Sequence, residues 1–91
     1  TLYGAEAKYL VAQQLYKAGE YTAAEKEILN FIDQSTPHAY WLARSFVLLS
    51  DVYVAMDKKL DARQYLLSLQ QNYHADDDIE QMINERLEKL K

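Results

Sequence analysis

Apolar residues recur along most of the chain at the spacing of amphipathic helices, and no segment alternates apolar and polar residues as a strand does. The pattern predicts an all-α fold of five helices, at about residues 3–18, 22–34, 38–56, 60–73 and 76–91. The third of them is apolar around nearly its whole circumference. Such a helix needs neighbours on several sides, so we expect it in the middle of the fold.

Local sequence signals predict where these helices begin and end. Gly19 is expected just after the first helix, because a glycine readily adopts the left-handed conformation that closes a helix. Residues 22–25 read Thr-Ala-Ala-Glu, the sequence of a capping box that satisfies two free amides at a helix start. Ser35 is expected to close the second helix. Two further helix starts are predicted: Thr36 as N-cap with Pro37 at the first helical position, and Asp77 with Glu80 as an acidic cap.

Comparison of the chain with itself reveals a repeat in which Ala24 aligns with Ala62. In this alignment small residues fall on small ones and large apolar residues on large ones. Each copy is a helical hairpin that cannot bury its apolar face alone, so we expect the copies to stack. The other matched pairs are Tyr3–Trp41, Ala5–Ala43, Leu10–Leu48, Val11–Leu49, Ala12–Ser50, Leu15–Tyr53, Ile28–Leu66, Leu29–Leu67 and Phe31–Leu69.

The repeated residues resemble the tetratricopeptide (TPR) repeat, whose pattern is W-x2-L-G-x2-Y, then A-x3-F, then P. The matching residues are Phe46, Leu49, Ser50, Tyr53, Ala62 and Leu66 in the second copy, and Lys8, Val11, Ala12, Leu15, Ala24, Ile28 and Pro37 in the first. The resemblance covers about residues 3–74. It implies a TPR-like α-solenoid in a single domain, 1–91, with hairpins at 3–36 and 37–74 and a capping helix at 76–91.

The chain departs from the TPR pattern at several points. Its period is four residues longer than the usual 34. Lys8 replaces the leading aromatic residue, and Asp57 replaces the glycine of the hairpin turn. The run from Thr36 to Phe46 also resembles the C-terminal repeats of long bacterial TPR proteins, which implies a place in the cell envelope or periplasm. Because the chain starts at Thr1 with no signal-peptide pattern, we expect it to be a piece of a longer protein.

Composition disfavours several classes of function. The net charge of −4, from 10 basic and 14 acidic residues, does not suit nucleic acid or an anionic membrane. No apolar run approaches the roughly 20 residues that span a bilayer, and the chain has no cysteine. His38 and His74 lie far apart without the three ligands of a metal site, and no serine stands in a G-x-S-x-G motif. We therefore predict no catalysis, metal or cofactor.

The resemblance to TPR repeats implies a concave groove lined by the first helix of each hairpin. The candidate residues step by three or four positions, so each set shares one helix face. They are Tyr9, Gln13, Tyr16 and Lys17 in the first hairpin, and Tyr40, Arg44, Val47 and Asp51 in the second. Mixed tyrosine, amide and charged side chains suit peptide binding, although tyrosines also pack against neighbouring helices. Tyr9, Gln13 and Asp51 do not match the basic, amide-rich set with which TPR domains clamp a C-terminal carboxylate.

The expected function is therefore a non-catalytic scaffold module that binds a protein or peptide partner through the concave face. Two hairpins are fewer than the three or more repeats that such arrays usually need. We accordingly expect an exposed edge that earlier repeats cover, formed by Leu2, Tyr3 and the exposed sides of Leu10 and Leu29. The alternative is self-association, in which this open end pairs with a second copy.

Overall fold

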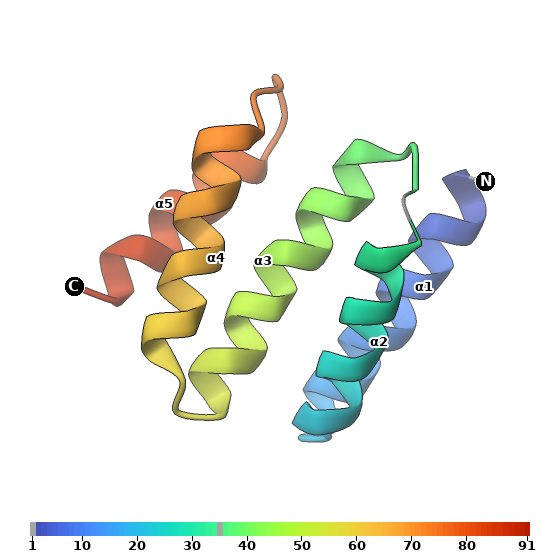
Figure 1. Cartoon of the computed structure of the whole chain (residues 1–91), viewed down its shortest axis with the longest axis horizontal. Helices are drawn as coiled ribbons and strands as arrows, with labels where there is room; N and C mark the ends of the chain where they lie inside the picture. Colours follow the sequence, from blue (N-terminus) through green and yellow to red (C-terminus); the bar gives the residue numbers. More distant parts are fainter. Residues whose placement is uncertain (1, 35) are drawn as a thin grey trace.

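The computed structural model describes residues 2–34 and 36–91, and for Leu2 only the backbone. Within these residues it contains five α-helices and no strand, so the all-α prediction is confirmed (Figure 1). The helices are α1 (Leu2–Lys17), α2 (Tyr21–Asp33), α3 (Ala39–Ala55), α4 (Lys59–Asn72) and α5 (Ile79–Lys89). Ser35, expected to close the second helix, and the Leu2 side chain, expected at the exposed edge, lie outside what is described.

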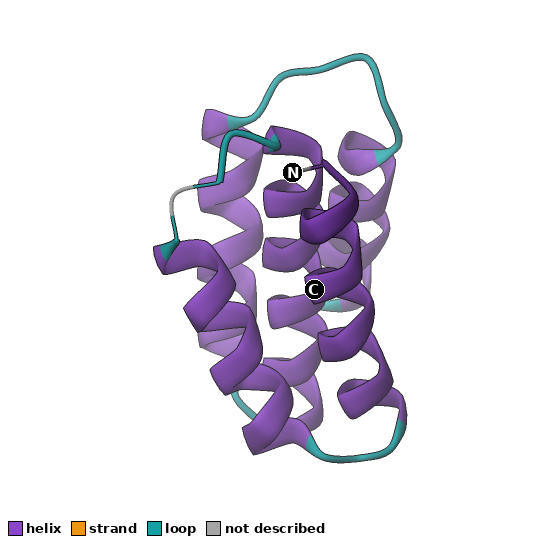
Figure 2. Cartoon of the chain, turned by 90° about the vertical axis from the view of Figure 1, so that its right-hand side faces the viewer, coloured by secondary structure: helices purple, strands orange, loops and turns teal. Residues whose placement is uncertain are grey.

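Helix α3 occupies the centre of the molecule, as its apolar circumference predicts. It packs against all four other helices, whereas within the described chain α1 and α2 make no backbone approach to α4 or α5. Figure 2 shows the helices lying side by side, with the connecting loops at the two ends of the bundle. Eight residues of α3 are buried, and most of them contribute to two core clusters, one shared mainly with α1 and α2 and one shared with α4 and α5.

The two helical hairpins share the same turn geometry at equivalent positions of the repeat. Gly19 and Asp57 are the residues with positive φ in the described chain, at 79° and 61°. Each closes a helix by a Schellman turn, in which the following amide reaches back to a carbonyl five residues earlier. The equivalent bonds are Glu20 N to Leu15 O (2.9 Å) and Lys58 N to Tyr53 O (2.7 Å). Asp57 thus adopts the turn conformation although it is not a glycine.

We predict opposite effects of substitution at these two turn positions. Gly19→Ala should lower the free energy of unfolding by about 1 kcal/mol, because an L side chain is strained at positive φ. No atom lies within 4 Å of the added Cβ, so backbone strain alone carries this cost. Asp57→Gly should raise the free energy by up to about 1 kcal/mol for the same reason. Urea titration of both variants measures this, and changes of the same sign would contradict it.

The predicted helix caps are wrong for α2 and α3. Helix α2 begins at Tyr21, directly after the turn, so Thr22 lies inside the helix and Glu20 is the N-cap without a side-chain bond. The Schellman turn takes so few residues that no position remains for a threonine cap. Helix α3 begins at Ala39, because Thr36 Oγ1 accepts the amide of His38 (3.2 Å) in a local turn and not in a helical cap.

The start of α5 also differs from the predicted acidic pair. Asp78 is the N-cap and makes no side-chain capping bond. Asp77 Oδ1 instead accepts a hydrogen bond from the backbone amide of Ile79 at 3.0 Å. This bond forms a turn that an aspartate side chain closes. Glu80 lies in the first helical turn, where its negative charge interacts favourably with the positive end of the helix dipole.

The expected exposed edge is present in part. Tyr3 is 84% exposed and Leu10 is 43% exposed, in line with the prediction. Leu29 is half-buried against the core cluster that contains Ala24 and Ile28, so only part of its side chain belongs to this edge. Helix α2 presents Leu29 toward the interior because α1 and α3 both pack against α2.

Candidate functional site

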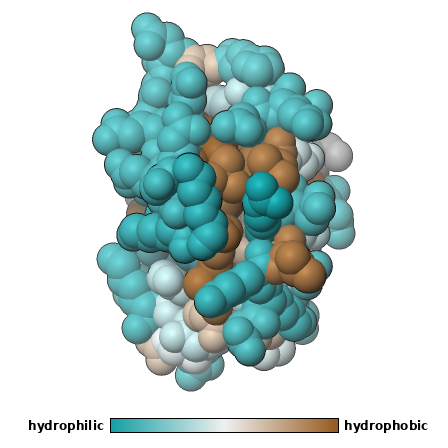
Figure 3. Space-filling view, turned by 90° about the vertical axis from the view of Figure 1, so that its left-hand side faces the viewer, coloured by the Kyte–Doolittle hydropathy of each residue, from teal (hydrophilic) through white to brown (hydrophobic). Residues whose placement is uncertain are grey.

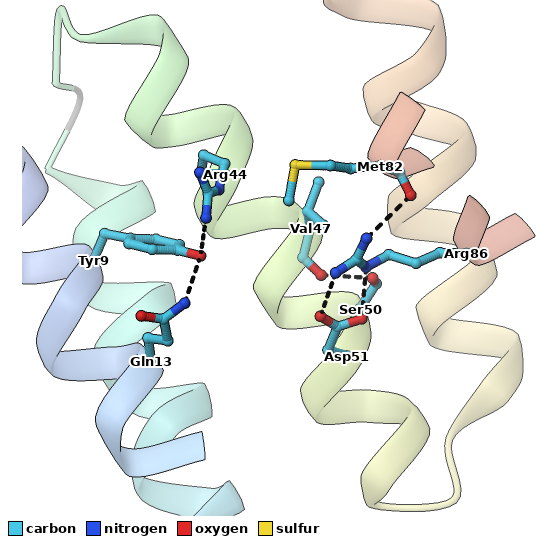
Figure 4. A network of polar contacts seen from close by, with 8 residues as sticks. All are labelled: Tyr9, Gln13, Arg44, Val47, Ser50, Asp51, Met82 and Arg86. Atoms are coloured by element: carbon cyan, nitrogen blue, oxygen red, sulfur yellow. Dashed lines mark hydrogen bonds and ion pairs between the residues drawn. The ribbon is translucent and has the colours of Figure 1, made fainter. Parts of the chain in front are cut away.

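Side chains from α1 and α5 converge on the central helix α3 along one side of the molecule (Figure 4). Tyr16 of α1, Asp51 of α3 and Arg86 of α5 border a hollow of about 490 Å³, called here the central hollow, to which α4 also contributes. Its lining mixes three bases, two acids, one tyrosine and aliphatic groups. The lining residues are Tyr16, Ser50, Asp51, Val54, Lys59, Leu66, Glu85, Arg86, Lys89 and Leu90.

An ion pair between Asp51 and Arg86 fixes α5 against α3 at the wall of the central hollow. Arg86 Nε and Nη2 donate to the two Asp51 carboxylate oxygens at 2.8 and 3.0 Å, and Nη1 donates to the Met82 carbonyl at 3.2 Å. Burial acts to lower the pKa of Arg86, but hydrogen bonds and the charge of Asp51 outweigh it and raise the pKa. Both side chains are about three-quarters buried, so this bidentate pair holds them in one orientation.

A second polar network joins α1 to α3 around Arg44. Its guanidinium donates to the hydroxyls of Tyr9 and Tyr40, each at 3.0 Å, and Gln13 donates to Tyr9 from the other side at 3.4 Å. The same guanidinium lies 4.9 Å from the Tyr9 ring centre and 5.8 Å from that of Trp41. These aromatic faces stabilise the cation by cation–π interaction. Arg44 is thereby held among rings from two helices.

The network continues from α3 to the start of α5. The Tyr40 hydroxyl, which accepts from Arg44, donates to Asp78 Oδ1 at 2.8 Å. Burial is the largest effect on the Tyr40 hydroxyl and raises its pKa, while the bond from Arg44 acts to lower the pKa. The three helices α1, α3 and α5 are therefore linked by polar side chains in addition to their apolar cores.

The eight residues predicted to line a groove have different surroundings. Tyr9 and Val47 are only 5% and 1% exposed, so their side chains pack in the core below the surface residues. Arg44 and its partners form the network just described, while Tyr16 and Asp51 lie at the central hollow. Lys17 is exposed and belongs to neither group. The half-buried residues of the set are Gln13, Tyr16, Tyr40, Arg44 and Asp51.

The residues of α5 at this site were not predicted from the sequence. Neither Arg86 nor Asp78 is among the candidate groove residues, and both lie in the segment predicted only as a capping helix. One signal could have identified Arg86: helical spacing puts it on the same stripe as Ile79, Ile83 and Leu90. A charged residue on an apolar stripe indicates a partner across the interface, which here is Asp51.

Tyr73, at the end of α4, gives the stability of the fold a dependence on alkaline pH. Burial, and then the hydrogen bond that its hydroxyl donates to Asp77, raise the pKa of Tyr73 to about 12. An unfolded tyrosine has a pKa of about 10, so folding favours the neutral form. Its contribution is fully present below about pH 10 and is lost as the pH rises toward 12.

We therefore predict that Tyr73→Phe makes the unfolding free energy fall less steeply between about pH 10 and 12. The slope does not vanish, because burial raises the pKa of Tyr16 and Tyr53 as well. Urea titrations of both chains across this range measure the slopes. Identical slopes in the parent and the variant would contradict the prediction.

The described residues contain no cluster that points to metal chemistry. Within 2–34 and 36–91, no three histidine or acidic side chains are grouped so that they could hold a metal ion. Of the helices described, none combines the length and apolar character required to cross a membrane. No protein-family model, curated protein or solved structure matches the chain.

Proposed function

We propose that this chain is a non-catalytic interaction module of the TPR type, whose concave face binds an extended segment of a protein partner. One observation carries the proposal: α1, α3 and α5 present polar and aromatic side chains to a single side of the molecule, and these side chains hold one another in place. The hairpin turn geometry, which recurs with the repeat, supports the TPR-like arrangement. Two hairpins and a capping helix form the proposed unit.

Pre-organisation supports binding at the central hollow. Asp51 fixes Arg86, so a partner does not have to order that side chain on binding. Val54 is 38% exposed and offers an apolar contact on the same wall. Lys59 and Lys89 are exposed at the rim of the hollow, where their ammonium groups can pair with an acidic group of the partner. The expected ligand is therefore a peptide with an apolar residue and a nearby acid.

Selection from a random peptide library on the immobilised chain, followed by fluorescence anisotropy of an enriched peptide, tests this proposal. Val54→Glu should weaken binding at least about tenfold, because it places a charge on the apolar wall of the hollow. Leu60→Glu is the matched control, since Leu60 is 82% exposed and lies outside the hollow. Equal losses in the two variants, or no enriched peptide, would refute a binding role of the hollow.

A further inference from the structure

The outer face of α1 carries apolar side chains that the described chain leaves uncovered. Leu10 is 43% exposed and Val11 is 52% exposed. Together with Leu15 and Ala18 they form a surface that we call the α1 face, which borders a shallow apolar hollow. Leu15 is half-buried, so the face continues into the core that lies below it.

The second repeat shows what covers such a face. Leu48 and Leu49 are the repeat equivalents of Leu10 and Val11, yet they are only 4% and 0% exposed. They belong to one core cluster with Ala24 and Ile28 of α2. The same positions are therefore exposed on α1 and buried on α3, because α2 packs against α3 and nothing described packs on the corresponding side of α1.

We propose that the α1 face docks the second helix of another helical hairpin, in the register in which α2 docks on α3. The inference is independent of the central hollow. The turn hydrogen bonds and the two positive-φ residues recur at equivalent positions of the repeat, so the α2–α3 interface can continue in the same geometry. Its occupant is an amphipathic helix with a small residue followed four positions later by a large apolar one, as Ala24 and Ile28 are in α2.

One position of the α1 face specifies the occupant further. Gln14 stands where the second repeat has Val52, which is fully buried. A docked helix would cover the Gln14 amide, and an unpaired buried amide costs binding free energy. The occupant therefore carries a polar side chain opposite Gln14, which the α2–α3 interface does not need at Val52.

A second copy of this chain fits the α1 face less well than such a helix. The apolar side of α2 is already buried between α1 and α3, so a second copy cannot offer that side. The end of the molecule opposite α1, where α4 and α5 lie, has a mostly hydrophilic surface with a narrow apolar strip (Figure 3). A second copy therefore offers little apolar surface there for the α1 face. A second copy could offer only its own α1 face, an arrangement that would make the chain a dimer through Leu10.

The test extends the full chain by repeating residues 1–38 ahead of residue 1, with Gln14→Val in the hairpin that follows. The added second helix then meets the α1 face with valine where the second repeat has Val52, so that no amide is left unpaired. Leu10→Gln is then made separately in the added hairpin and in the hairpin that follows it. In the following hairpin, where docking buries Leu10, the melting temperature should fall by about 5 °C or more. In the added hairpin, whose α1 face is again uncovered, the change should be small.

The outcomes separate the possible occupants. A loss confined to the following hairpin supports the proposal. Equal effects in both hairpins, or an added hairpin that melts by itself while the rest is unchanged, overturn it. Light scattering of the original chain across a concentration series provides a further readout. A dimer that Leu10→Gln dissociates would overturn the proposal, because the occupant would then be a second copy.

Discussion

Leu49→Ala is expected to lower the free energy of unfolding by about 2–5 kcal/mol, the range for truncating a large side chain in a packed core. Leu49 is 0% exposed and shares a core cluster with Ala24 of α2 and Ala62 of α4. Both neighbours are small, so the cavity left by truncation cannot be filled without moving a helix. Small domains have a total stability of about 5–15 kcal/mol, so this variant should unfold at much lower urea concentration.

Val11→Ala is the matched control for this prediction. Val11 occupies the position equivalent to Leu49 in the first repeat but is 52% exposed. Its truncation should change the unfolding free energy by about 0.5 kcal/mol or less. Urea titration followed by circular dichroism compares the two. Similar losses would show that the two repeat positions have the same surroundings, contrary to the structure.

Arg86→Met should lower the unfolding free energy by about 1–3 kcal/mol, because it leaves the Asp51 carboxylate without its bidentate partner. The side chain of Asp51 is only 23% exposed, so water compensates this loss incompletely. Methionine keeps much of the aliphatic stem that packs beside the α5 apolar stripe. The change should also weaken hydrogen-exchange protection of α5, since α5 loses its charged link to α3.

Two further variants distinguish the ion pair from a general effect of charge. Lys91→Met removes the exposed Lys91–Glu88 pair, whose side chains are 76% and 72% exposed, and should have little effect. Asp51→Asn combined with Arg86→Met should cost less than the sum of the single changes, because neither charge is then left alone. Additive losses would indicate that the two side chains contribute independently.

Much of the helical architecture could be predicted, because its determinants are local. The spacing of Ala24, Ile28 and Phe31 shows the buried side of α2, and all three are buried. The repeat also aligns Gly19 with Asp57, and both residues adopt the turn conformation. Asp57 is a departure from the TPR pattern, but an aspartate tolerates positive φ better than most residues.

What could not be predicted depends on contacts between distant segments. Thr22 has the sequence of a cap, but the hydrogen bond from Glu20 to Leu15 decides where the helix starts. Tyr9 shares a helix face with Gln13, yet packing against Trp41 buries it. Arg86 contributes to the candidate site because the α4–α5 loop returns α5 to α3. Helical periodicity gives the face of each helix but not its neighbour.

The central position of α3 bears on how the chain reaches its fold. In the part that the structure describes, each helix packs against its neighbours along the sequence or against the helix two places away. The loops that must close during folding are therefore short, and their entropic cost is small. Chains with such local contacts fold in microseconds to milliseconds. Partly folded forms, with the apolar surface of α3 open to other chains, should consequently be short-lived, which limits aggregation during synthesis.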